Sequence, residues 1–325
     1  MEMRKPFVIA AMLLCSSLAI AQEADELGGS NAEFSVIARA EYLYGDPLGN
    51  SSLYATFDGS ISDNLTYSFG THLLSSTPGA LYANSFRADD VDWLDWATLT
   101  WAVGDFELTF GKEDILLGTN EMAESDWDIH FPFASSIWHN LYTYEWGLRG
   151  TWYPVEGLTL DARVSASPYS AYPFTGGLLT YGLKAAYEQT ESWGVMAAYD
   201  VIGTDAGEYT GLLTAGANLF LGDASICVDF QNKVGDPMFV LVDGIGTSLQ
   251  CAYTFSEQLT AIAHTGYEKM DANFGGLEDI NAGLAVHYFP IEGLRVHALG
   301  SYRWGDIAPG PTFSIGVTYN FSLSL

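Results

Sequence analysis

The chain has 325 residues, of which 48% are hydrophobic and 14% aromatic, and its formal net charge is −28. This acidic balance argues against a nucleic-acid-binding function, which requires a basic surface. Three cysteines are too few for a disulfide-stabilised scaffold. After the N-terminal segment, no apolar run approaches the roughly 18 residues of a membrane-spanning helix, which excludes a helical inner-membrane protein.

The N-terminal segment has the features of a secretory signal. Arg4 and Lys5 precede a short apolar run, and small residues lie at and before Ala21 as a cleavage site requires. We therefore expect a signal peptide at residues 1–21. The mature protein is expected to be a single domain at residues 22–325, exported from the cytoplasm.

Apolar and polar side chains alternate along the whole mature chain. In YTYEWGLRGTW, residues 142–152, aromatic and leucine side chains fall on one face, and Thr, Glu, Gly and Arg on the other. The segment GLTLDARVSAS, residues 157–167, repeats this period of two, which is typical of β-strands with one apolar face. About sixteen such segments of roughly 9–13 residues occur, as expected of a medium transmembrane β-barrel. The other face is expected to be built from Gly, Ser, Thr and Asn with scattered charges.

The links between these segments decide between a membrane barrel and a soluble β-sandwich, because both have one apolar and one polar face per strand. Long and short links alternate strictly, which a sandwich has no reason to do. The pattern predicts an all-β, up-and-down antiparallel transmembrane barrel of about 16 strands, with both termini on the side of the short turns. The expected links are, alternately long and short, 46–50, 62–64, 76–92, 104–105, 113–141, 154–157, 168–176, 189–191, 203–208, 222–223, 232–244, 256–258, 270–277, 290–293 and 305–311.

The C-terminal stretch TFSIGVTYNFSLSL is apolar at nearly every second residue. We expect it to be the last strand, paired with the first so that no strand edge faces lipid. Through Ser314, Gly316, Tyr319 and Phe321 it resembles the insertion signal of outer-membrane barrels, although Leu325 replaces the usual terminal Phe. This resemblance implies recognition by the barrel-assembly machinery.

The chain resembles the outer-membrane porins of Gram-negative bacteria in its signal peptide, its alternating strands and the third of its long links, which is much longer than the others. The resemblance implies an integral outer-membrane protein that forms a water-filled channel for passive diffusion of small hydrophilic solutes and ions. It also implies a homotrimer, and a third loop, residues 113–141, that folds into the barrel as a constriction. For the acidic outer loops we expect contact with lipopolysaccharide through divalent cations, beside the contact of the barrel with outer-membrane lipid.

The charges suggest which residues line the constriction. The long loop carries acidic residues and no Lys or Arg, whereas most basic residues of the mature chain fall on inward phases of their strands. An acidic loop opposite a basic wall would set a transverse field across the pore. Alternatively, inward arginines pair with inward carboxylates, such as Arg149 with Asp161, and the loop is only a surface loop. The candidate pore-lining residues are Glu121, Glu124, Asp126, Asp128, Arg39, Arg149, Arg163, Arg295 and Arg303.

Other chemistry has little support in the sequence. The six histidines lack metal-ligand spacing, and no nucleotide-binding or nucleophile motif occurs in a fitting context. We predict no catalytic residue, cofactor or metal, and leave open a cation bound by His130 with Asp126 and Asp128. Two alternatives to a diffusion porin stay open, a substrate-specific uptake channel and a barrel enzyme such as a lipase or protease. A plugged transporter is excluded, because only QEADELGGSNA precedes the first strand.

Overall fold

A computed structural model describes residues 31–44, 51–75, 94–125, 127–141, 143–170, 177–189, 192–204, 209–234, 244–270, 276–306 and 309–325. Within these ranges the chain forms sixteen β-strands and two short helices. The predicted signal peptide lies outside the described residues. In the part of the chain that the structure describes, no helix has the length and apolarity needed to cross a bilayer.

The strands are β1 (Ala32–Leu43), β2 (Ser52–Ser62), β3 (Leu65–Ser75), β4 (Leu94–Val103), β5 (Phe106–Asp114), β6 (Tyr144–Val155), β7 (Leu158–Ala166), β8 (Leu179–Gln189), β9 (Trp193–Gly203), β10 (Tyr209–Leu221), β11 (Ala224–Val234), β12 (Gly244–Ser256), β13 (Leu259–Met270), β14 (Glu278–Ile291), β15 (Leu294–Gly305) and β16 (Gly310–Ser324). The helices α3 (Asn120–Ala123) and α4 (Ser136–Asn140) both lie between β5 and β6.

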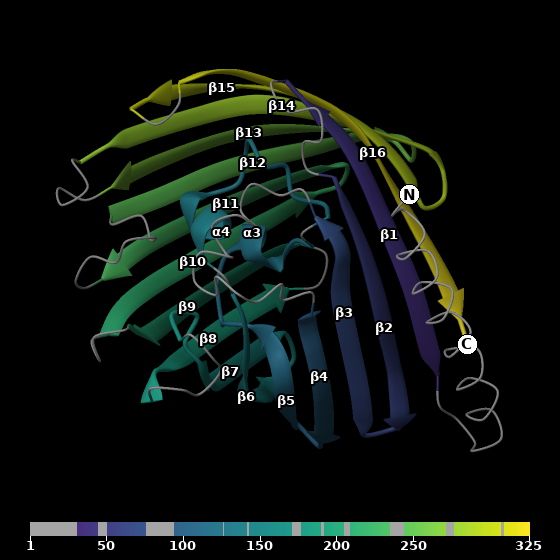
Figure 1. The fold of residues 1–325 in the computed structure, drawn as a ribbon, viewed down its shortest axis with the longest axis vertical. Helices are drawn as coiled ribbons and strands as arrows, with labels where there is room; N and C mark the ends of the chain where they lie inside the picture. The colour runs from purple at the N-terminus through teal and green to yellow at the C-terminus, as the bar shows by residue number, and fades with distance from the viewer. Residues whose placement is uncertain are drawn as a thin grey trace, which may run out of the picture.

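The strands form a closed antiparallel barrel in which each pairs with its neighbours in the sequence (Figure 1). The ring closes where β1 pairs with β16, in a register that runs from Glu33 opposite Ser324 to Leu43 opposite Ser314. Beyond the last strand, the backbone N of Leu325 donates to the carbonyl of Ala32 at 2.8 Å. The expected pairing of the last strand with the first is therefore confirmed.

The alternation of side chains sorts each strand into an outer and an inner face. On β6, Leu148 and Trp152 point outward and are 41% and 43% exposed, whereas Glu145 and Thr151 on the inner face are 0% and 4% exposed. Large exposed hydrophobic side chains recur in this outward phase on most of the strands. A belt of exposed apolar side chains around a closed barrel is typical of a transmembrane barrel, because such a surface is stable against lipid.

The short links predicted from the sequence are tight turns. Gly104 joins β4 to β5 with φ +59°, and Gly222 joins β10 to β11 with φ +64°. A positive φ at these positions favours glycine, which has no Cβ to clash with the backbone. The long third link differs slightly from its expected range. Strand β5 continues to Asp114 and so includes Glu113, and β6 begins at Tyr144, so this link, called the long loop below, spans residues 115–143.

The long loop lies inside the barrel, with α3 beside β10 and β11 (Figure 1). Its residues Ile115, Leu117, Ile137 and Leu141 form a buried cluster with Ile202 and Leu212 of the inner wall and with Tyr169 of the link between β7 and β8. A second contact places Phe133 of the loop on Ala285 and Leu299 of the wall. The inner face is therefore less uniformly polar than the sequence analysis expected. Its apolar patches are covered by the loop, and each fully buried Leu or Ile contributes roughly 1.5–3 kcal/mol.

Candidate functional site

Two arginines of the inner wall hold one stretch of the long loop. Arg39 of β1 donates through Nη1 to the backbone carbonyls of Trp127 (3.0 Å) and Ile129 (2.8 Å). Arg295 of β15 donates through Nη2 to the same Trp127 carbonyl at 3.1 Å, and its Nη1 lies 2.5 Å from Oδ1 of Asp128. The several donors of a guanidinium allow each arginine to bind more than one acceptor at once. These two side chains therefore attach the loop to the seam where the barrel closes.

Three histidines surround this attachment. Nε2 of His130, in the loop, lies 2.7 Å from Nε2 of His287, and the His130 ring centroid is 5.2 Å from that of His297. Nε2 of His297 lies 3.6 Å from Oε2 of Glu41, which pairs with Arg39 at 2.5 Å. Burial lowers the pKa of His130 well below its usual 6.5, and His287 and Arg39 lower it further. The docked position therefore favours the neutral form of His130.

Two carboxylates farther along the wall, on β11 and β13, bind the first residues of the loop helices. Asp229 of β11 accepts from the backbone N of Asn120 (2.7 Å) and of Glu121 (3.1 Å), at the start of α3. Glu268 of β13 accepts from the backbone N (2.7 Å) and the hydroxyl (2.6 Å) of Ser136, at the start of α4. The first N–H groups of a helix have no partner within the helix, so these carboxylates satisfy them.

Glu121 links the two helices to each other. Its carboxylate accepts from the backbone N and the hydroxyl of Ser135, each at 2.6 Å, and from Nε2 of Gln231 at 3.2 Å. Ser135 is in turn the N-cap of α4. Burial raises the pKa of Glu121 to about 7, against the lowering effect of the Ser135 hydrogen bonds, and the neighbouring Asp229 and Glu268 raise it further.

Arg149 and Arg163 face inward as predicted, but they are not at the loop attachment. Nη2 of Arg149 lies 3.0 Å from Oε2 of Glu113, and the buried Arg163 donates to the Glu113 carbonyl at 2.7 Å. Arg149 does not form the alternative pair with Asp161; it pairs with Glu113, and Asp161 accepts from the Thr151 hydroxyl at 2.6 Å. These two arginines thus pair with a carboxylate of their own wall, at the base of the long loop.

The remaining candidate residues are dispersed. Nε of Arg303 lies 3.2 Å from Oδ2 of Asp279 on the neighbouring strand. Glu124 follows α3 as its C-cap and is exposed, and Asp126 lies outside the described residues. Of the nine candidates, the structure brings together Arg39, Arg295 and Asp128. Asp128, the acidic residue of the long loop in this group, is in direct contact with Arg295 of the wall.

The possible cation site is not formed by the described residues. Asp128 is bound to Arg295 and His130 to His287, so neither turns toward a shared centre. Among the residues that the structure describes, no group of three His, Cys, Asp or Glu side chains is arranged to hold a metal ion. Strand alternation in the sequence predicts that His287 and His297, which lie opposite each other on β14 and β15, point inward. The sequence does not predict their contact with His130, because a loop has no regular alternation of side chains.

The docking of the long loop is expected to depend on pH in opposite directions at Glu121 and at His130. The pKa of Glu121 is raised from 4.5 to about 7, so the docking free energy it contributes is present below pH 4.5 and is lost as pH rises through about 7. The lowered pKa of His130 means that docking there weakens as pH falls below 6.5. Hydrogen exchange of loop peptides between pH 5 and 8, corrected for intrinsic rates, should show faster exchange at Ser135–Ser136 at high pH and at residues 127–131 at low pH.

Substitutions separate the two responses. Glu121→Gln should flatten the pH dependence of exchange at Ser135–Ser136 alone, and His130→Gln that at residues 127–131 alone. A loop whose two sides change with pH in the same direction would contradict the roles assigned to Glu121 and His130.

The chain was compared with known proteins. No family model and no curated protein matches it. Among solved structures, a loop-deletion mutant of OmpT, an outer membrane protein of Vibrio cholerae, is 15% identical with a TM-score of 0.64, over 90% of this chain and 99% of that one. OmpF of Salmonella typhi in complex with daunomycin is 14% identical with a TM-score of 0.63, over 90% and 97%. A mutant of Rh. blastica porin is 12% identical with a TM-score of 0.59, over 90% and 99%.

At these identities the likeness concerns the fold. Within the described residues the chain has the closed, sixteen-strand antiparallel barrel of the porins, and the neighbours include proteins named as outer-membrane proteins. The fold class and the resemblance to porins that the sequence predicted are therefore confirmed.

Proposed function

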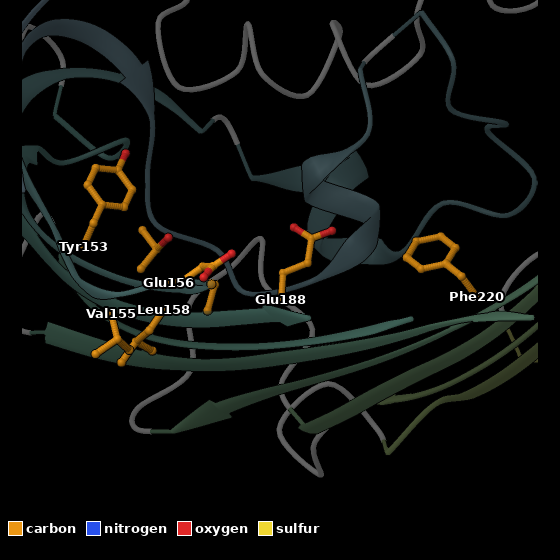
Figure 2. A pocket seen from close by; sticks show the side chains of 9 residues that line it. Tyr153, Val155, Glu156, Leu158, Glu188 and Phe220 are labelled. Carbon is orange, nitrogen blue, oxygen red and sulfur yellow. The ribbon is translucent and has the colours of Figure 1, made fainter. Parts of the chain in front are cut away.

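We propose that this chain is an integral outer-membrane porin, a water-filled channel for passive diffusion of small hydrophilic solutes and ions. The observation that carries the proposal is the long loop, which wall donors at Arg39 and Arg295 and wall acceptors at Asp229 and Glu268 hold inside a closed barrel. Such a loop narrows the lumen. A hollow of about 1000 Å³ lies on the wall, lined by residues of β6–β8 and β10 near the short turns (Figure 2). The fold shared with porins supports the same function.

The proposal extends to processing and assembly. Residues 1–21 would be removed as a signal peptide, and residues 22–325 would be inserted into the bacterial outer membrane by the barrel-assembly machinery, which reads the C-terminal strand. A homotrimer is proposed because one neighbour, OmpT of Vibrio cholerae, was solved in a trimer form. The barrel would contact lipid and lipopolysaccharide, bind no nucleic acid and catalyse no reaction.

Liposome swelling tests the diffusion function. Vesicles containing the refolded barrel are expected to swell in isotonic sugar solutions at rates that fall steadily as the sugar becomes larger. At constant total osmolarity, the rate should rise linearly with the concentration of the permeating sugar. Protein-free vesicles are the control. Swelling that saturates for a single sugar would instead indicate a substrate-specific channel, and the absence of swelling for all sugars would contradict diffusion.

Ion selectivity should depend on the exposed loop carboxylate. Desolvation inside the barrel raises the pKa of Glu124 to about 7, so the test is made at pH 8. There Glu124→Gln removes a lumen charge and no hydrogen bond that holds the loop, and it is expected to shift permeability toward anions. Arg303→Gln should shift it toward cations. Reversal potentials in a KCl gradient measure both shifts, which should shrink between 0.1 M and 1 M salt as the Debye length falls from about 10 Å to about 3 Å. Unchanged selectivity in Glu124→Gln would place this carboxylate outside the ion path.

A further inference from the structure

The hollow of about 1000 Å³ lies near the short turns of β6–β7 and β10–β11. Its lining includes Tyr153, Glu156, Glu188 and Phe220, and Figure 2 shows these four side chains on the same side of the strands. Strand alternation places Tyr153 and Glu188 on the inner face, the first in phase with Thr151 and the second with Gly182. The hollow is therefore part of the lumen wall, at the end of the barrel where the chain turns are short.

One glycine shapes this hollow. Gly157, in the β6–β7 turn, has φ +80°, and a Cβ there would lie 2.4 Å from the carbonyl O of Glu188. The backbone N of Glu188 donates to the Gly157 carbonyl at 2.9 Å. The turn is thus fixed against β8 at the residue whose carboxylate lines the hollow.

The lining has negative charge and aromatic surface. It contains two carboxylates, Glu156 and Glu188, and no Lys or Arg. A third carboxylate, Glu107, accepts from the Tyr153 hydroxyl at 2.9 Å and fixes the position of that ring. Among the described residues, no Lys or Arg is paired with Glu156 or Glu188. The nearest cation along β8 is Lys184, about 13 Å away at roughly 3.3 Å per residue.

We propose that this hollow, the periplasmic site below, binds organic cations that carry an aromatic or alkyl group. Glu156 and Glu188 would attract the ammonium, and the face of Phe220, two strands from Glu188, would contact it or its apolar substituent, since aromatic faces attract cations. Tyr153, on β6, bounds the other end of the hollow. This inference rests on the proposed channel function and names a class of solute that the channel would enrich at its periplasmic mouth.

The test uses benzyltrimethylammonium as the probe and benzyl alcohol as its uncharged counterpart. Calorimetric titration of the detergent-folded barrel should detect binding of the cation and weaker binding of the alcohol. Glu188→Gln should weaken cation binding about fivefold or more, since an ion pair at 4 Å contributes about 1 kcal/mol even in water. Phe220→Leu should weaken it about two- to fivefold, the loss of one exposed cation–π contact.

Glu33→Gln is the matched control. Glu33 lies on β1 at the same end of the barrel, opposite Ser324, and is outside the hollow. Glu33→Gln therefore removes one carboxylate charge from the same end of the barrel but not from the site. Binding that is unchanged in Glu188→Gln and Phe220→Leu, or weakened as much in Glu33→Gln, overturns the site, as does a wild-type barrel that binds no probe. KCl conductance is recorded in parallel. A barrel that binds the probe but conducts no KCl current contradicts only the diffusion function. A barrel that conducts but does not bind the probe contradicts only the site.

Discussion

Arg39→Met is expected to lower the free energy of unfolding by about 3–5 kcal/mol and to release the adjacent part of the long loop. Arg39 is 3% exposed, and the substitution removes its two hydrogen bonds to the loop carbonyls of Trp127 and Ile129. It also leaves the Glu41 carboxylate, whose side chain is 2% exposed, without its guanidinium partner. Removing one member of a buried ion pair is strongly destabilising because the other charge stays buried. Urea titration of the folded barrel in lipid vesicles measures the loss.

The double variant Arg39→Met with Glu41→Met is the control for the buried charge. Because it removes both charges, it should lose less stability than Arg39→Met alone. In both variants hydrogen exchange should become faster at residues 127–131 but not at Ser136, which Glu268 still holds. An Arg39→Met barrel with the stability and loop protection of the wild type would show that this contact does not hold the loop.

Leu249→Arg is expected to destabilise the barrel by about 2–4 kcal/mol, the effect of an arginine at the bilayer midplane on a lipid-facing position. Leu249 lies in the middle of β12, points outward and is 40% exposed. The recovery of heat-modifiable folded protein and urea titration in vesicles both report the loss. The effect should disappear for the same substitution near a strand end, where arginine reaches the polar interface.

The neighbouring residue provides the control for Leu249→Arg. Gln250 lies on the inner face of the same strand, opposite Cys227 of β11. Gln250→Arg therefore adds the same side chain at the same depth but into the lumen, and the barrel should keep close to wild-type stability. A loss for Gln250→Arg with none for Leu249→Arg would mean that the inner and outer faces of β12 are exchanged, and equal losses would contradict the assignment of Leu249 to the lipid face.

The barrel could be predicted from the sequence because strand alternation and link length are properties of short, continuous stretches of sequence. The phase of β6, for example, follows from Leu148 and Trp152 facing lipid while Thr151 faces inward. The closing pair of strands followed from the apolar alternation of the C-terminal stretch. The inward phases of Arg39 and Arg295, two strands apart across the closure, were readable for the same reason.

The partners of the long loop were not predictable in this way. A loop has no period, so nothing in the sequence pairs Asp128 with Arg295, His130 with His287, or Ser136 with Glu268. The apolar residues Ile202 and Leu212, like Leu299 on β15, interrupt the polar inner face, and the docked loop covers them. The hydrogen bonds of Glu121 to Ser135, which join α3 to α4, were likewise not predictable from its sequence position.

Single-channel recording in a planar lipid bilayer tests the central claim, an open barrel narrowed by an anchored loop. The purified, folded wild-type protein is expected to insert in uniform steps and to conduct a steady ionic current in KCl. Arg39→Met should conduct with larger and noisier openings, because the anchored loop is then partly released. Folded protein that inserts but carries no current would contradict the account, and so would a variant whose current equals that of the wild type after loop release has been shown by hydrogen exchange.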